Sequence, residues 1–293
     1  MRDYVFFTDS DSDMPYQIFD KMDAQMIMMP YSLDGKDLVP DLGRSNDNGK
    51  PFFDRMRAGA VPSTSLLPTP VYIDCFEKYL AAGRDILVIA FSSKMSNTIQ
   101  NMNMAKDELL EKYPERRIEI VDTLSISGPQ TLLTVTAYEM YEKGASMDEV
   151  KDWVMANRLR ARAYFTVNDL VYLKRGGRIS NAAAFFGSML DLKPILVEGR
   201  LGKVSPAEKV QGRKKAIRTI AARVKETIVE PEKQRVIILH ADCEGDAARL
   251  CEHLSEMVPE IQTDVYPIGP VIGAHCGPGT LAACFMGIER EVD

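Results

Sequence analysis

The chain has 293 residues, of which 36 are Lys or Arg and 42 are Asp or Glu, so its formal net charge is −6. Apolar residues make up 45% of the chain and charged residues 27%, and both values are ordinary for a globular protein. This composition excludes a disordered, collagen-like or coiled-coil chain. A mildly acidic chain is also a poor non-specific ligand for nucleic acid, so no nucleic-acid partner is expected.

The cysteines and the uncharged stretches indicate a cytoplasmic protein. The five cysteines are odd in number and form no C-x-x-C pair, which favours reduced thiols over disulfides or a zinc site. The chain turns acidic at Asp9, too early for a signal peptide. The longest uncharged run, 265–288, is rich in Pro and Gly and is predicted to form turns rather than a transmembrane helix. We therefore expect a cytoplasmic location and no metal or cofactor.

Strand and helix patterns alternate along the first half of the chain. Strands are predicted at Tyr4–Thr8, Met26–Tyr31, Ile86–Phe91 and Ile118–Val121, with a hairpin turn at 33–36. Helices are predicted at Phe52–Arg57, Val71–Ala82, Thr98–Tyr113 and Leu132–Lys143, and residues 61–70 are predicted to form a loop. Ser146 and Glu149 form a capping box for a further helix. These repeated units predict a parallel sheet with helices on both faces.

The second half of the chain mixes hairpins with crossover helices. Strands are predicted at Phe165–Val167, Ile195–Glu198, Gly202–Ser205, Arg235–His240 and Ile261–Tyr266, the second and third forming a hairpin. Helices are predicted at Leu170–Lys174, Glu208–Glu226 and Asp246–Met257. This pattern predicts an α/β domain with a mixed sheet. With about 150 residues per domain as the prior, we place the boundary near Arg160, giving domains 1–160 and 161–293.

An acidic loop at 9–13 follows the first predicted strand. One interpretation is a Mg²⁺-dependent phosphatase in which Asp9 is the nucleophile and Asp11 a second acid. Ser12 stands where such enzymes usually have Thr or Val, and no downstream lysine motif is evident. A calcium loop is excluded because Met14 occupies the position that requires Gly. The alternative is a strand-end loop that caps the next helix.

Two hydroxyl-rich loops, at 63–65 and 92–98, are candidates for binding an anion. The second follows the buried strand that ends at Phe91, and it contains Ser93 and Ser96. Ligands of doubly wound sheets bind beyond the carboxyl ends of the strands, where hydroxyl groups and free backbone N–H groups suit a carboxylate or phosphate. Ordinary helix capping by Ser and Thr is the alternative.

His275 lies in a glycine-rich segment, which lets a ligand approach the backbone closely. Its imidazole is a candidate donor to a carboxylate, and a satisfied turn histidine is the alternative. A hydrolase built on Ser93 and His275 is disfavoured because no G-x-S-x-G elbow marks the serine. In the basic cluster 174–178, Arg175 and Arg178 are candidates for contact with a phosphate or an acidic partner, or else form a solvated charged face.

Several short motifs follow one another in a characteristic order along nearly the whole chain. The most specific are L-K-R-G-G-R-I-S at 173–180 and G-x-H-x-G-P-G at 273–279. With the other motifs they resemble the DegV family of bacterial lipid-binding proteins. The other matching segments are Thr8-Asp9-Ser10, Asp13-Met14-Pro15, Thr64-Ser65, 91–98, Val121-Asp122-Thr123, 169–172, 192–196, 212–216 and 268–272.

The resemblance implies a three-layer α/β/α domain, a two-layer mixed-sheet domain and one long-chain fatty acid, such as palmitate, stearate or oleate, held between them. It implies that the carboxylate is met by loop hydroxyls and by the His of the glycine-rich segment. Some members of the family deliver the fatty acid to the ATP-binding subunit of a fatty acid kinase, which forms an acyl phosphate. The residues to which the carboxylate contacts carry over are Thr64, Ser65, Ser93, Ser96 and His275.

The sequence departs from the family pattern in ways that affect these expectations. Asn97 replaces a usual Gly, and its side chain is expected to narrow the carboxylate end. The usual T-S-Q-P is stretched over 64–68, which leaves the register of Thr64 and Ser65 open, and Gly128-Pro129-Gln130 replaces a commoner G-x-G. Gln211 stands where Arg is common, which puts coupling to a kinase in question.

Three functional hypotheses follow. The first is a cytoplasmic carrier that binds one fatty acid without catalysis of its own. Transient contact with a membrane is compatible with this role. The second is a phosphatase-type hydrolase that uses Asp9 and Asp11. The third is a regulator that senses lipid and binds a macromolecular partner.

Overall fold

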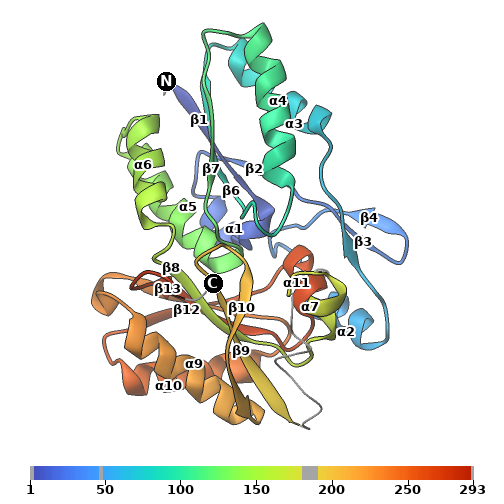
Figure 1. The fold of residues 1–293 in the computed structure, drawn as a ribbon, viewed down its shortest axis with the longest axis vertical. Coiled ribbons are helices and arrows are strands. Elements are labelled where there is room, and N and C mark those ends of the chain that lie inside the picture. Colours follow the sequence, from blue (N-terminus) through green and yellow to red (C-terminus); the bar gives the residue numbers. More distant parts are fainter. Residues whose placement is uncertain (1–2, 46–48, 180–190, 292–293) are drawn as a thin grey trace.

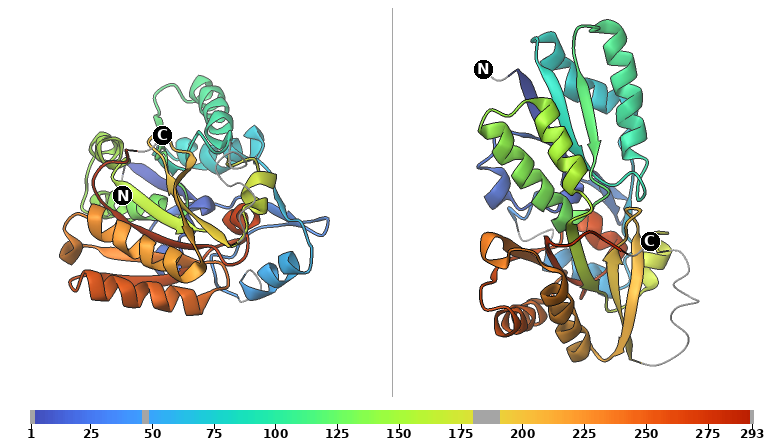
Figure 2. Two further views of the ribbon diagram at one scale, coloured as in Figure 1. Left: turned by 60° about the horizontal axis from the view of Figure 1, so that its bottom comes forward. Right: turned by 60° about the vertical axis from the view of Figure 1, so that its left-hand side comes forward.

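The computed structural model describes residues 3–45, 49–179 and 191–291. Its strands form two large sheets, one from each half of the chain, and one small sheet beside them (Figure 1). Helices flank both large sheets, and the two halves lie one above the other along the longest axis (Figure 2). No helix among these residues is long and apolar enough to cross a membrane.

The first sheet has four parallel strands in the order β2-β1-β6-β7, which are Gln25–Ile27, Tyr4–Asp9, Asp85–Ala90 and Ile118–Asp122. Successive side chains of a strand point to opposite faces, and β1 shows the consequence. Phe7 packs edge-on against Phe76, whereas Phe6 packs against Tyr138. The first face is covered by α3 (Thr69–Ala81) and α4 (Thr98–Lys112), the second by α5 (Ser127–Glu142) and α6 (Met147–Asn157). The predicted three-layer arrangement is therefore confirmed.

The small sheet is antiparallel, in the order β4-β3-β5. Its hairpin of β3 (Tyr31–Leu33) and β4 (Lys36–Leu38) confirms the turn predicted at 33–36. The loop predicted at 61–70 contains β5 (Ser63–Thr64), which pairs with β3 and so fixes the position of Thr64. The short helices of this region are η1 (Ser10–Ser12), α1 (Tyr16–Phe19) and α2 (Lys50–Arg57).

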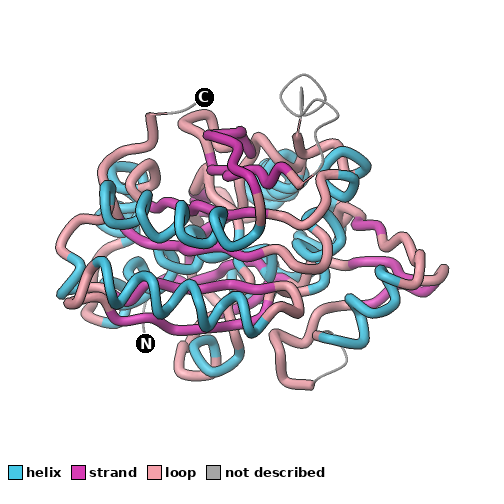
Figure 3. The backbone as a smooth tube through the Cα atoms, turned by 90° about the horizontal axis from the view of Figure 1, so that it is seen from below, coloured by secondary structure: helices cyan, strands magenta, loops and turns pink. Residues whose placement is uncertain are grey.

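The second sheet has six strands in the order β10-β9-β8-β13-β11-β12, and only β11 and β12 are parallel neighbours. The strands are β8 (Ala161–Thr166), β9 (Leu192–Glu198), β10 (Val204–Gln211), β11 (Arg235–His240), β12 (Gln262–Pro267) and β13 (Leu281–Met286). The two helices α9 (Arg213–Thr227) and α10 (Glu244–Met257) cover one face (Figure 3). The remaining short helices are α7 (Val171–Arg175), η2 (Pro231–Lys233) and α11 (Pro270–Cys276).

Besides the loop at 61–70, the strand predicted at Met26–Tyr31 differs from the structure, because it is divided between β2 and β3. Three further elements also differ. The helix predicted at Glu208–Glu226 begins only at Arg213, because 208–211 continue strand β10 and Gly212 adopts φ +84°, which ends the strand. Helix α5 begins five residues before Leu132, because Pro129 lies in its first turn, where no intrahelical N–H is needed. The tail predicted to form turns contains α11 and the central strand β13.

The uncovered face of the six-stranded sheet packs toward the first half of the chain. Along β13, Ala283 and Phe285 face α9 and α10, whereas Ala282 and Cys284 join a core that also contains Phe7 and Tyr72.

The strands of the first sheet all end before residue 123, and those of the second begin at 161. As a domain boundary, the position near Arg160 stays a prediction.

Candidate functional site

A cavity of about 120 Å³ lies where the two halves meet. One water needs ~15 Å³ on a comparable measure, so the cavity can hold a much larger guest. Its walls come from both halves and are predominantly apolar, which disfavours filling by ordered water. The apolar lining residues are Met29, Leu66, Phe91, Met95, Ile126, Pro129, Ala163, Phe165, Leu173, Val204, Ile268, Val271, Ile272, Cys276, Ala282 and Cys284.

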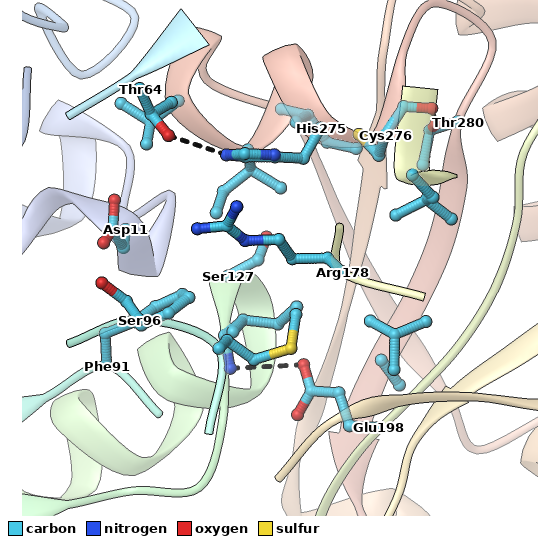
Figure 4. Close-up of a pocket in the computed structure, with 18 of the residues that line it drawn as sticks. Asp11, Thr64, Phe91, Ser96, Ser127, Arg178, Glu198, His275, Cys276 and Thr280 are labelled. Atoms are coloured by element: carbon cyan, nitrogen blue, oxygen red, sulfur yellow. Dashed lines mark hydrogen bonds between the residues drawn. The ribbon is translucent and has the colours of Figure 1, made fainter. Parts of the chain in front are cut away.

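A polar end of the cavity is formed by five side chains from separate elements (Figure 4). Asp11 comes from η1, Thr64 from β5, Ser96 from the loop before α4, Arg178 from the segment after α7 and His275 from α11. We call this set the polar end, and Ser65, which also lines the cavity, adjoins it next to Thr64. Glu198 lines a different part of the cavity wall, apart from this set (Figure 4). The cavity is thus a mainly apolar space in which five polar side chains gather at one place, while Glu198 and Thr280 line other parts of its wall.

His275 and Thr64 bring two distant parts of the sequence into contact. The Nε2 atom of His275 is 2.8 Å from Oγ1 of Thr64, within hydrogen-bond distance. A Cβ atom at Gly176 would lie 2.3 Å from Nδ1 of His275, so a glycine at 176 is what lets the ring sit there. Burial, with a smaller contribution from Arg178, lowers the pKa of His275 to about 4. The imidazole is therefore neutral at pH 7 and acts as a hydrogen-bonding group rather than as a cation.

Arg178 supplies the positive charge of the polar end. Its half-buried guanidinium donates to the backbone oxygen of Gly176 and points toward Asp11 across the cavity (Figure 4). Burial lowers the pKa of Arg178, and the nearby charge of Asp11 partly offsets this. An arginine stays protonated at physiological pH, so this end of the cavity is suited to an anionic group.

Asp9 and Asp13 hold the acidic loop in place rather than facing the cavity. Asp9 accepts hydrogen bonds from the backbone N–H of Phe91 (2.8 Å) and from the amide of Gln130 (3.0 Å). Asp13 accepts one from the hydroxyl of Ser127 and one from the N–H of Gly269 (2.9 Å). Burial raises the pKa of Asp9 to about 6 and that of Asp13 to about 7. Asp9 is fully buried with both oxygens bonded, which is a poor state for a phosphatase nucleophile.

The structure does not bring every predicted site residue to the cavity. The described lining includes neither Ser93 nor Arg175. The hydroxyl of Ser93 instead donates to Oδ2 of Asp122 (2.6 Å), and Arg175 is exposed. Asn97 is exposed and also absent from the described lining, so its side chain does not narrow the polar end.

Two further positions of the family motifs, Gln211 and Ser180, do not contribute to the described cavity lining. Gln211 is exposed at the end of β10, away from the polar end residues that line the cavity. Ser180, the last residue of the L-K-R-G-G-R-I-S motif, lies outside the described residues.

A buried ion pair that the sequence did not signal lies beside the cavity. Glu198 ends β9, and its Oε2 is 2.8 Å from Nη2 of Arg290, whose side chain is only 2% exposed. Arg290 also donates to Ser125 Oγ and to the backbone oxygen of Ala161. Burial raises the pKa of Glu198 to about 7, and Arg290 opposes this rise. The pair therefore links the C-terminal segment to both halves of the chain.

Comparison with known sequences gives a consistent result. The sequence profile described as "Uncharacterised protein, DegV family" matches residues 5–287. A DegV domain-containing protein of Clostridium perfringens is 38% identical over 99% of this chain and 100% of the relative. A protein of Thermotoga maritima named as fatty acid-binding is 33% identical over 97% of both chains.

Comparison with solved structures extends this to three dimensions. A DegV lipid-binding protein from Thermotoga maritima is 30% identical, with a TM-score of 0.83 over 99% of this chain and 100% of that one. A DegV family protein from Thermus thermophilus, described by its fatty acid binding, is 28% identical, with a TM-score of 0.84 over 98% and 100%. The Thermotoga maritima and Thermus thermophilus proteins are thus described by their binding of lipid or fatty acid.

Proposed function

Because the chain belongs to the DegV family, we propose that it binds one long-chain fatty acid in the cavity, with the carboxylate at the polar end. In this proposal the acyl chain of a palmitate, stearate or oleate lies along the apolar wall between two α/β domains, 1–160 and 161–293. The observation that carries it is one apolar cavity with hydroxyls, a neutral imidazole and an arginine at one place. Such an arrangement provides an apolar wall for the acyl chain and polar partners for the carboxylate.

The energetics support this ligand class. Each buried methylene contributes ~0.8 kcal/mol, so an apolar wall provides most of the affinity for a long chain. A carboxylate taken out of water needs charged or hydrogen-bonding partners. Arg178 supplies the charge, and Thr64, Ser65, Ser96 and His275 supply hydrogen bonds. Ser93 has no such part in this proposal, because its hydroxyl is engaged by Asp122.

Lipid extraction tests the proposal directly. Organic extraction of the purified protein, followed by mass spectrometry, is expected to yield about one fatty acid per chain. Delipidated protein is expected to take up palmitate, stearate or oleate on titration. An empty extract, together with no uptake of any of the three acids, would refute the proposal while leaving the fold unaffected.

We further propose that the protein is a carrier that presents its bound fatty acid to an ATP-dependent fatty acid kinase subunit. Leu66, which lines the cavity near Thr64, is 43% exposed, so the cavity wall reaches the molecular surface beside the polar end. Arg175 is exposed and lies close to Arg178 in the sequence, so it is a candidate contact for the kinase subunit.

Addition of such a kinase subunit and ATP to the loaded protein is expected to form acyl phosphate, detected as its hydroxamate. If loaded protein forms none, a lipid-sensing regulator becomes the better description. A pull-down of macromolecular partners with and without lipid then tests that alternative.

A further inference from the structure

Asp11 is an acid of the polar end that has no hydrogen-bond partner at one of its oxygens. The residue is 5% exposed, and its Oδ1 is buried without a partner among the described residues. Its carboxyl group lines the cavity and faces the guanidinium of Arg178 across it (Figure 4). No ion pair within 4 Å joins the two in the described part of the chain, and both side chains line the same cavity. A buried polar atom without a partner is rare in folded proteins and calls for an explanation.

The charged groups around Asp11 limit the possible explanations for its unpartnered oxygen. Among the described lining residues near it, Arg178 is the cation, because His275 is neutral at pH 7. Burial and the charges of Asp9 and Asp13 raise the pKa of Asp11 well above its usual value, and Arg178 opposes this rise. The titratable and charged groups that face Asp11 are Asp9 and Asp13 in its own loop, Tyr72 in α3, Arg178 after α7 and His275 in α11.

A fatty acid carboxylate at this place would add a second acid to one arginine. Two buried carboxylates that share a single cation repel each other, and one of them then keeps its proton. Asp9 and Asp13 are not placed to donate that proton to the ligand, because they are absent from the described cavity lining and their oxygens accept from backbone and side-chain donors. Asp11 has a free oxygen and can donate one O–H when protonated.

We propose that Asp11 is a ligand-binding residue that is protonated in the complex and donates a hydrogen bond to the fatty acid carboxylate while Arg178 supplies the positive charge. This inference rests on the proposed function and assigns the acidic loop a part in it. A carboxylate has two acceptor oxygens and a negative charge, so it can accept from the O–H of Asp11 and also meet the charge of Arg178, whereas an alcohol of the same chain length carries no charge for Arg178 to meet. When Asp11 is ionised in the free protein, binding takes up one proton, so the affinity falls as pH rises. The limiting slope of this fall is tenfold per pH unit.

The test compares wild type with Asp11→Asn and Asp11→Ala, using dodecanoate as the probe at several pH values from 6 to 9. Asn copies the shape and the donor of a protonated carboxyl group but does not titrate. Asp11→Asn is therefore expected to bind within about threefold of wild type at pH 6 and to show no Asp11-dependent change up to pH 9. Asp11→Ala removes the donor and is expected to bind roughly tenfold more weakly at pH 6. Asp107→Asn, at an exposed position on α4, is the control for loss of one negative charge.

The titration of dodecanoate itself is common to all variants, so the ratio of wild-type to Asp11→Asn dissociation constants isolates Asp11. The expected ratio rises with pH over the range in which free Asp11 ionises, and calorimetry in two buffers of different ionisation enthalpy is expected to show more proton uptake in wild type over that range. Asp11→Ala that binds as tightly as wild type at pH 6, or Asp11→Asn that binds far more weakly than wild type there, overturns the inference but leaves the proposed function standing. Failure of wild type to bind dodecanoate, palmitate or stearate at any pH overturns both. Thermal unfolding of each variant identifies loss of fold.

Discussion

The substitution Ala282→Phe is expected to weaken stearate binding by at least about 100-fold. Ala282 lies on the central strand β13, lines the cavity and pairs in register with Phe165 of β8. A phenyl group at 282 would fill space that the proposed acyl chain needs. Excluding four methylenes from the apolar wall removes ~3 kcal/mol of binding free energy, which is about a 100-fold change. Displacement of a fluorescent fatty acid by stearate measures the change.

Two other Ala→Phe substitutions control for the cost of the new side chain. Ala207 is exposed on β10, so Ala207→Phe is expected to bind stearate as wild type does. Ala283 is fully buried against α9 and α10, so Ala283→Phe is expected to lower stability sharply through overpacking. If a folded Ala282→Phe binds stearate with wild-type affinity, the acyl chain does not occupy this cavity.

The hydroxyl loops and the glycine-rich segment could be predicted because turn chemistry is local. Ser and Thr at strand ends and Gly around a lone His leave a mark in the sequence itself. The structure brings Thr64, Ser96 and His275 to one cavity, although 211 positions separate Thr64 from His275. The resemblance to a family, rather than any spacing rule, joined those segments beforehand.

Other features depend on partners that are distant in sequence, and no local pattern reveals them. Whether Ser93 faces the cavity or Asp122 depends on how β6 and β7 align. The ion pair of Glu198 and Arg290 joins positions 92 residues apart. The helix predicted from Glu208 was wrong at its start, because the exposed Lys209 and Gln211 alternate there with the buried Val210 along a strand whose outer side meets solvent. The sequence offers Asp11 as a candidate catalytic acid, and only the cavity shows that it shares the polar end with Arg178.

Removal of Arg290 is expected to give the largest loss of stability. Arg290→Gln leaves the carboxyl group of Glu198 buried without its cation and leaves the acceptors at Ala161 and Ser125 without their donor. Removing one member of a buried pair typically costs 3–5 kcal/mol, so we expect a loss of ~4 kcal/mol at pH 8. Urea unfolding monitored by circular dichroism measures it. Arg200→Gln, which removes an exposed arginine 3.6 Å from Glu289, is the matched control and is expected to change little.

The loss in Arg290→Gln is also expected to depend on pH with a definite sign. The pKa of Glu198 is about 7 in the folded wild type, and loss of the cation raises it further. Between pH 7 and pH 9 the folded variant therefore holds more protons than the folded wild type, so its free energy of unfolding falls relative to wild type by up to ~1.4 kcal/mol per pH unit. Below pH 6 Glu198 is protonated in both folded proteins, and only the lost hydrogen bonds of Arg290 separate them. The double variant Glu198→Gln/Arg290→Gln is expected to lose this pH dependence. A difference between Arg290→Gln and wild type that stays constant from pH 5 to 9 would show that Glu198 carries no charge that Arg290 balances.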